Sequence, residues 1–391
     1  MRTSNRLRAA WRQATAVSGV TALAGALAIA LSGPASAAAA HRPGFLRGAD
    51  DAVFVQTDNI AGNQVVAYDR AGDGTLTLAH TYATGGLGGQ LSGSVVDHLA
   101  SQGSLQYDAP HALVYAVNAG SDTVSVFAVR GDRLFLRQVI GSGGTFPVSV
   151  AVHGDLVYVL NALGGGSVQG YRLLFGRLFP ISGSRRTLGL DPTATPQFTN
   201  TPGQVAFSPD GSQLTVTTKA NGNDIDVFRV GAFGGLSASP VVNPEPGTVP
   251  FAIAFDQAGH LVIANAGTNA VATFTLNPDG TVTLIDSAGT GQAATCWVAP
   301  DGPLLFASNA GSASISGYTS ASSGTLTLLG QTATDPGTVD AAATPGGQFL
   351  YVQTGSTGTV DEFTVDTAGT LAKIGSVTVA GAVGGEGIAA S

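Results

Sequence analysis

The sequence predicts an all-β protein folded as a seven-bladed β-propeller with four-stranded blades. Its composition and two independent repeat patterns indicate this architecture. Of the 391 residues, 44% are hydrophobic, 11% are charged and 55 are glycines. A chain of this kind can bury a large core and must turn often, which is typical of globular β proteins and not of helical or disordered ones.

The first repeat is a short apolar strand that ends in an aromatic residue. It recurs with a period of about 45 residues, and longer insertions occupy the first and third intervals. Such a period is typical of propeller blades. The seven aromatic residues are Tyr68, Phe127, Tyr171, Phe228, Phe274, Tyr318 and Phe363.

The second repeat is a strand of the Gly-x-Leu-x-Leu kind that follows each aromatic residue by about ten positions. The seven copies end at Leu78, Leu136, Ile181, Ser239, Ile285, Leu329 and Ile374. Two registers with the same count, and four short strands in each unit, describe propeller blades. Leucine-rich repeats are shorter, and helical solenoids need a 3.6-residue period that no segment shows.

Ring closure is also predicted. The innermost strand of a blade recurs at 148–152, 203–207, 251–255, 296–300 and 339–344, whereas the first blade begins with its second strand at 52–57. The last residues, EGIAAS at 386–391, have the pattern that the first blade lacks. We therefore expect the C-terminal strand to join the first blade and close the ring.

The N-terminus has the three parts of a secretory signal peptide. Four arginines between Arg2 and Arg12 precede a small, apolar run at 14–31 and an A-x-A-like site at 33–37. We expect a signal peptide at 1–37, a linker at 38–51 and the propeller at 52–391. Without an Arg-Arg pair before the site, the general secretory route is indicated, and the expected location is extracellular. An uncleaved membrane anchor is the alternative.

The net charge limits which kinds of partner are expected, and the cysteine content indicates what stabilises the fold. The formal net charge of −8 indicates no basic patch for a phosphate backbone, so nucleic acid is not expected as a partner. Cys296 is the single cysteine, so this chain has no intramolecular disulfide and is stabilised by packing. We also expect a monomer with no membrane span in the mature chain.

The blade sequences resemble those of the seven-bladed lactonase propellers. The resemblance rests on LVYVLN at 156–161, VSVF at 124–127, the Gly-x-Leu-x-Leu strands and the PDG turns in FSPDG at 207–211 and NPDG at 277–280. This family includes bacterial 6-phosphogluconolactonases and carboxymuconate-cyclising enzymes. The resemblance covers residues 52–391 and implies the propeller fold and a hydrolysis or isomerisation of a small lactone or carboxylated ring compound.

The sequence departs from the resembled family at the His and Arg residues that begin its inner strands. The corresponding segments at 145–152, 201–207, 248–255 and 294–300 contain neither residue at these strand starts. Asp97 and His98, in the insertion before the second blade, are the nearest candidates. With Asp340 and Glu386 they are the ionisable groups expected to reach one channel mouth, and hydrolysis needs such a group as general base.

A ring of polar residues is expected around the same mouth, where second strands end. Asn side chains also favour tight turns, so a purely conformational role is the alternative. Together with carboxylates, these amides have the oxygen ligands that Ca²⁺ takes, whereas no His pair has the spacing of a zinc site. No other cofactor is expected. The predicted ligand-binding residues are Asn118, Asn161, Lys219, Asn265 and Asn309.

Two functions remain open from the sequence. The first is an exported lactonase-type carboxylic ester hydrolase, for which 6-phosphogluconolactone is disfavoured because that metabolite is cytoplasmic. The second is a non-catalytic extracytoplasmic propeller that binds a protein, a glycan or a small ligand, which the low charge and a bare channel mouth favour.

Overall fold

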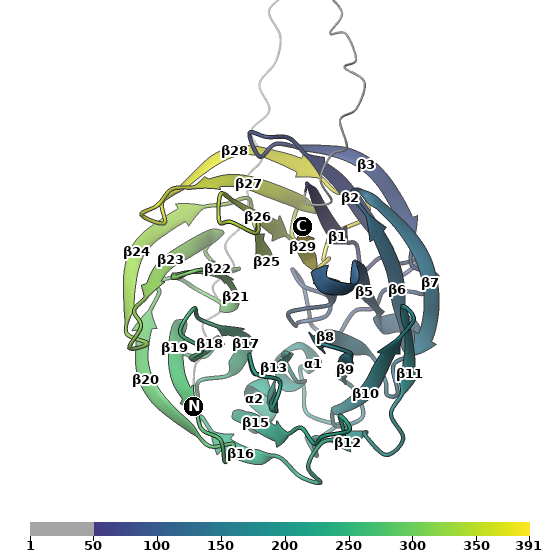
Figure 1. Cartoon of the computed structure of the whole chain (residues 1–391). Coiled ribbons are helices and arrows are strands. Elements are labelled where there is room, and N and C mark those ends of the chain that lie inside the picture. The colour runs from purple at the N-terminus through teal and green to yellow at the C-terminus, as the bar shows by residue number, and fades with distance from the viewer. Residues whose placement is uncertain (1–50) are drawn as a thin grey trace, which may run out of the picture. The chain divides into compact units, whose positions relative to one another are not determined.

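The computed structural model describes residues 51–391, and their strands form seven antiparallel sheets arranged in a ring (Figure 1). The all-β, seven-bladed prediction is confirmed. The predicted signal peptide and all but the last residue of the linker lie outside the described residues. Within the described part, no helix is both long and apolar enough to span a bilayer.

Each blade contains four strands that follow one another from the channel outward. The first blade contains β29 Ile388–Ala390, β1 Ala52–Gln56, β2 Gln64–Arg70 and β3 Leu76–Ala83. The second contains β4 Leu105–Asp108, β5 Leu113–Asn118, β6 Thr123–Arg130 and β7 Arg133–Gly141. The third contains β8 Pro147–His153, β9 Leu156–Asn161, β10 Ser167–Leu174 and β11 Arg177–Pro180, with the short β12 Arg186–Thr187 beside β10.

The remaining four blades repeat this order. The fourth contains β13 Val205–Phe207, β14 Gln213–Thr217, β15 Asp224–Arg229 and β16 Val241–Pro244. The fifth contains β17 Pro250–Phe255, β18 Leu261–Asn265, β19 Ala270–Leu276 and β20 Val282–Gly289. The sixth contains β21 Thr295–Asp301, β22 Leu304–Asn309, β23 Ser314–Ser320 and β24 Leu326–Ala333. The seventh contains β25 Thr338–Ala343, β26 Phe349–Thr354, β27 Thr359–Val365 and β28 Leu371–Thr378.

The ring is closed by the C-terminal strand, as predicted. Strand β29 pairs antiparallel with β1, so that Ala389 lies opposite Phe54. Ser391 extends this pairing, because its hydroxyl accepts from the Ala52 amide at 3.0 Å and donates to the Ala52 carbonyl at 3.1 Å. No covalent bond joins the two ends, so these strands and their packing hold the ring together.

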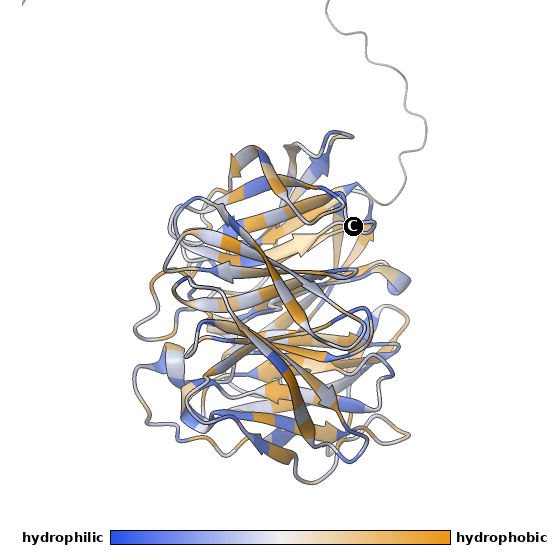
Figure 2. Ribbon diagram, turned by 90° about the vertical axis from the view of Figure 1, so that its left-hand side faces the viewer, coloured by the Kyte–Doolittle hydropathy of each residue, from blue (hydrophilic) through white to orange (hydrophobic). Residues whose placement is uncertain are grey.

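The core lies between adjacent blades, and the repeated aromatic residues fill it. All seven are buried at the ends of third strands, which confirms the first repeat. The Tyr171 hydroxyl also donates at 2.5 Å to Gly141, where the outer strand of the preceding blade ends. Hydrophobic segments lie mainly within the strands (Figure 2). Burial of such a side chain contributes about 1.5–3 kcal/mol.

The second repeat is confirmed in six blades and is wrong in the fourth. There the segment GGLSAS was expected to form the outer strand, but Leu236 makes only an isolated bridge with Val230. The outer strand is instead β16, from Val241 to Pro244. Pro240 has no amide hydrogen for the ladder and separates the two segments.

The closure of the ring gives a stability prediction. Ile388 is buried in β29, whereas Val383 lies exposed just before this strand. We expect Ile388→Ala to lower the free energy of unfolding by about 2–5 kcal/mol, and the deletion of residues 387–391 to have a larger effect. Val383→Ala, the control, is expected to change it by less than about 0.5 kcal/mol. Denaturant unfolding measures both; a deletion variant as stable as the full chain contradicts this role for β29.

Candidate functional site

The long insertion between β3 and β4 lies across one mouth of the channel. The Gln102 side chain bonds to Val298 on the inner strand of the sixth blade, donating to its carbonyl at 2.9 Å and accepting from its amide at 3.0 Å. The Ser101 carbonyl accepts from the Trp297 indole at 2.7 Å, and the Ser101 hydroxyl donates to Val148 of the third blade at 2.9 Å. The mouth is therefore occupied by the chain, which corrects the expectation of a bare one.

Four carboxyl groups converge at this mouth, one of them from the insertion itself: Asp58, Asp97, Asp340 and Glu386, hereafter the channel acid cluster. All four are buried. The Glu386 amide donates to Asp58 Oδ2 at 2.8 Å, and Glu386 Oε1 accepts from the Gly103 amide at 3.0 Å. Asp340 lies close enough to Glu386 for its charge to raise the pKa of that carboxyl group. The segments that meet here follow β1, lie in the insertion, begin β25 and precede β29.

The channel acid cluster cannot hold four full negative charges. Burial raises the pKa of Asp58 to about 8, of Asp340 to about 7 and of Asp97 to about 6. Burial, and then the charges of its three carboxyl neighbours, raise the pKa of Glu386 well above its ordinary value. Asp340 and Glu386 thus oppose each other's ionisation, since like charges in one buried volume favour the neutral form of the carboxyl group.

Lys219 is the cation nearest the cluster, but its ammonium group is fully used by the chain. Its Nζ donates to the carbonyls of Ala100 at 2.6 Å and Phe198 at 2.7 Å and to the Thr201 hydroxyl at 3.1 Å. These are the three donors of an ammonium group. Burial lowers the Lys219 pKa to about 7, although the charge of Asp97 opposes this. Lys219 is the first residue of the short helix α2 Lys219–Gly222. It thus anchors the insertion next to the short helix α1 Gln197–Asn200.

Three of the four predicted catalytic residues, Asp97, Asp340 and Glu386, are therefore brought together, and His98 is not. The backbone amide of His98 donates to Gly384 at 2.8 Å, and its half-buried ring packs against that glycine. Burial lowers the His98 pKa, so the ring is neutral near pH 7. Within the described residues, no hydrogen bond or ion pair joins this ring to the cluster.

Asp58 is the member of the cluster that the sequence analysis missed. It directly follows the AVFVQT strand of the first blade, one position beyond Thr57, which stands where other blades place the asparagines that were singled out. A carboxylate at the next position, where four other blades have alanine, was the available signal. Its backbone has a φ of 52°, an uncommon left-handed conformation outside glycine.

The four predicted ligand-binding asparagines are buried within the blades. Asn118 donates to the Ser125 hydroxyl at 2.8 Å, and Asn309 donates to the Ser316 hydroxyl at 3.0 Å. Asn161 donates to the Ser142 carbonyl at 3.2 Å. No hydrogen bond is found for the Asn265 carbonyl oxygen within the described part of the chain. These contacts support the conformational alternative, and a ligand-binding role stays a prediction.

Asn118 and Asn265 each begin an Asn-Ala-Gly turn, and a close approach of another backbone segment requires the glycine in both turns. A Cβ on Gly120 would lie 2.2 Å from the Gly88 carbonyl oxygen, and one on Gly267 would lie 2.4 Å from that of Gly247. The left-handed residue comes later in the turn, at Asp122 and Asn269. Asn118 itself is not left-handed, since its φ is −123°.

Calcium at this mouth remains a prediction. The Gln56 amide donates to Asp58, and the Gln353 amide donates to the Gln56 carbonyl at 3.1 Å. The side-chain carbonyl oxygens of both glutamines are buried and have no hydrogen-bond partner within residues 51–391. Oxygen donors of this kind suit Ca²⁺. However, no three or more His, Cys, Asp or Glu side chains in this part of the chain are arranged to hold a metal ion.

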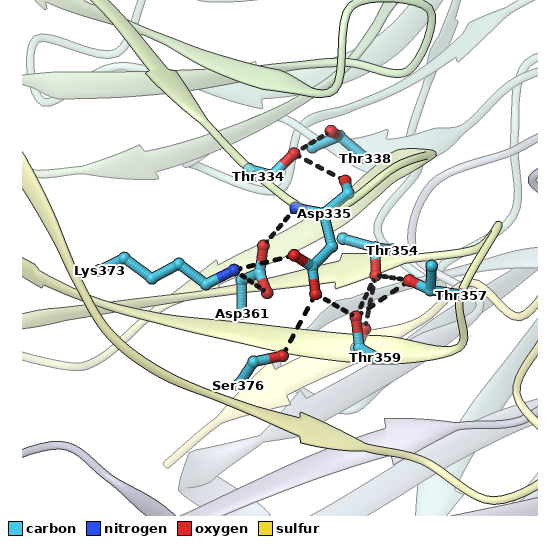
Figure 3. A network of polar contacts seen from close by, with 9 residues as sticks. All are labelled: Thr334, Asp335, Thr338, Thr354, Thr357, Thr359, Asp361, Lys373 and Ser376. Carbon is cyan, nitrogen blue, oxygen red and sulfur yellow. Dashed lines mark hydrogen bonds and ion pairs between the residues drawn. The ribbon is translucent and has the colours of Figure 1, made fainter. Parts of the chain in front are cut away.

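A second group of carboxylates, in the seventh blade, shows what a neutralised arrangement looks like (Figure 3). Lys373 Nζ lies 3.0 Å from Asp335 Oδ1 and 2.8 Å from Asp361 Oδ1. Burial raises the pKa of Asp335, but the hydrogen bond and charge of Lys373 outweigh it, and the pKa is lowered overall. In the channel acid cluster, burial outweighs the hydrogen bonds and the charge of Lys219, so the pKa values stay raised, which makes it the candidate site.

The cluster gives stability a defined dependence on pH. A folded-state pKa raised above the unfolded value stabilises the fold at low pH, and this stabilisation is lost as the pH rises through the folded pKa. For Asp58, Asp340 and Asp97 this loss falls between the ordinary value of 3.8 and about 8. The lowered pKa of Lys219 acts with the opposite sign, but only above about 7.

We therefore expect the melting temperature of the wild type to fall between about pH 5 and pH 7. The melting temperature of Asp58→Asn should fall less over this range, because the carboxyl group that resists ionisation is gone. The side-chain amide of Gln56 can turn so that its oxygen accepts from the new asparagine amide. Thermal unfolding followed by circular dichroism at each pH measures this, with Asp73→Asn, an exposed position, as the control. Parallel curves for wild type and Asp58→Asn contradict the assignment.

Comparison with known proteins supports the resemblance inferred from the repeats. The family model "Lactonase, 7-bladed beta-propeller" matches residues 280–384, from the outer strand of the fifth blade through the seventh. No curated protein matches the chain.

Solved structures with the same fold cover most of the chain. A proposed 6-phosphogluconolactonase from Bacteroides fragilis is 21% identical, with a TM-score of 0.67 over 89% of this chain and 99% of that one. A second, from Bacteroides uniformis, is also 21% identical, with a TM-score of 0.69 over 85% and 98%. The periplasmic gluconolactonase PpgL of Pseudomonas aeruginosa is 18% identical, with a TM-score of 0.68 over 86% and 98%. At these identities the likeness shows the fold.

Proposed function

We propose that this seven-bladed propeller, which matches the lactonase family model over residues 280–384, hydrolyses a small lactone at the channel mouth. The observation that carries this proposal is the convergence of Asp340 and Glu386 in the buried channel acid cluster, where the pKa of each is raised. In such a pair one carboxylate accepts a proton from water while its partner holds the other proton. Water attacks the lactone carbonyl carbon, the ring C–O bond breaks and a hydroxy acid is released.

The charge of the mouth favours a neutral lactone over a phosphorylated one. The carboxyl groups would repel a phosphate group, and the nearby cation, Lys219, is already bonded to the chain and does not offset this repulsion. The likeness to the Pseudomonas aeruginosa periplasmic gluconolactonase is consistent with a neutral sugar lactone. Substrate entry requires the insertion to move, since Gln102 and Ser101 span the mouth.

The channel acid cluster also gives a reason for the second candidate, a propeller that binds without catalysis. Each member already accepts a hydrogen bond from the chain itself, as Asp97 does from the amides of Leu99 and Ser101 at 2.8 and 2.9 Å. In this alternative the cluster fastens the insertion to the ring, and a ligand binds elsewhere on the surface.

A panel of neutral and phosphorylated lactones distinguishes the two functions. We expect turnover of a neutral lactone, and a loss of about 10²-fold or more in kcat for Glu386→Gln and Asp340→Asn. Glu362→Gln, which changes a buried carboxylate on the third strand of the seventh blade, is the control. Assays with added calcium and with a chelator test the metal. No turnover of any lactone by folded protein favours the binding function.

We also propose that the chain is exported, on the basis of its charged start, apolar run and small-residue site at 33–37. In the native host, N-terminal sequencing of the protein should find a mature chain that begins at Ala38. Recovery of the uncleaved chain from a membrane fraction would instead indicate an anchor.

A further inference from the structure

Three neighbouring hairpins differ in composition from the equivalent hairpins of the other blades. They join the third and outer strands of the second, third and fourth blades, at residues 129–137, 172–180 and 229–237. They read VRGDRLFLR, RLLFGRLFP and RVGAFGGLS, whereas the other blades have polar turns such as NPDG and SASSG. We call these three hairpins the Arg–Phe rim.

The tips of the rim expose aromatic side chains that contribute nothing to the core. Phe175 is fully exposed and Phe233 is 88% exposed, and Phe135 and Phe179 are about half exposed on the adjacent outer strands. Phe175 and Gly176 have φ values of 53° and 71°. A turn with two positive φ values favours Asn-Gly, so neither folding nor turn geometry accounts for a phenylalanine here.

Exposed arginines surround these tips. Arg130, Arg133, Arg137 and Arg177 are all exposed, and within residues 51–391 none of them forms an ion pair. The Arg130 guanidinium lies 5.6 Å from the centre of the Phe135 ring. The negative net charge therefore conceals a local concentration of arginine, since Asp132 is the one acidic residue in these three hairpins.

Contacts between blades make the three hairpins one continuous surface. Gln138 of the second blade donates to the Leu178 carbonyl at 3.0 Å and accepts from the Leu178 amide at 2.7 Å. Arg172 of the third blade donates to the Phe233 carbonyl at 3.2 Å, which holds the tip of the fourth-blade hairpin against the third blade. The aromatic tips and the arginines are thus presented together.

From this arrangement we infer that the Arg–Phe rim docks the protein on an anionic lipid bilayer. Protruding aromatic side chains enter the boundary between headgroups and acyl chains, and arginines bind the headgroup phosphates beside them. A soluble anionic polymer would engage the arginines but would leave Phe175 and Phe233 in water. The inference is independent of the proposed lactone hydrolysis, since no member of the channel acid cluster belongs to the rim.

Vesicle co-sedimentation of the mature chain tests this inference. We expect binding to vesicles of phosphatidylcholine with phosphatidylglycerol, weaker at about 150 mM salt than at low salt, and little binding to pure phosphatidylcholine. Phe175→Ser with Phe233→Ser should weaken binding on the order of tenfold. Each of Arg133→Gln and Arg177→Gln should weaken it by about fivefold.

Matched controls separate the rim from general surface effects. Leu284→Ser with Leu328→Ser removes exposed apolar side chains from the outer strands of the fifth and sixth blades, and Lys373→Gln removes one positive charge from the seventh. Both should bind vesicles like the wild type, and unchanged melting temperatures would show that the rim variants fold. Binding to soluble polyphosphate but not to anionic vesicles overturns the inference, as does an equal loss in the controls.

Discussion

The pairing of β29 with β1 is the interaction on which both the fold and the candidate site depend. It closes a ring that has no disulfide, and it also brings together two members of the channel acid cluster. The backbone amide of Gln56 donates to the Gly387 carbonyl at 2.8 Å, and the backbone amide of the preceding residue, Glu386, donates to the Asp58 carboxylate. Loss of this strand would therefore open the ring and dismantle the cluster at the same time.

The pairing of β29 with β1 also brings like charges together in one buried volume, which lowers the stability of the fold. Amides and hydroxyls of the insertion donate to two of the four carboxyl groups, Asp97 and Glu386, and these hydrogen bonds offset only part of the desolvation. A protein that needed the insertion only as a plug could use apolar side chains there at lower cost. The retention of ionisable groups at this point is the physical reason to look for chemistry at the mouth.

The repeats predicted the fold almost completely, because each blade buries the same pattern of side chains and this pattern recurs in the amino-acid sequence. The fourth blade is the exception, where Pro240 moves the outer strand beyond the segment with the matching sequence. The site was only partly predictable. Asp340 and Glu386 lie at the starts of inner strands, so their register placed them at the mouth.

The repeats could not predict that Asp58 belongs to the cluster, nor that the chain itself uses all three donors of Lys219. The first depends on which blade has a carboxylate at a position where four others have alanine. The second depends on how the insertion and α1 fold over the mouth, and such irregular loops have no repeat to follow. His98 shows the same limit, because a neighbour of Asp97 in sequence has its ring against Gly384 instead of in the cluster.

Strand direction places the mouth and the Arg–Phe rim on opposite faces of the ring. Inner strands begin at the mouth, and successive strands of a blade run antiparallel, so the turn between the third and outer strands lies at the far end. A propeller docked by its rim would therefore present the channel acid cluster away from the bilayer. Membrane attachment and access of a soluble substrate to the mouth are thus compatible, since neither surface has to cover the other.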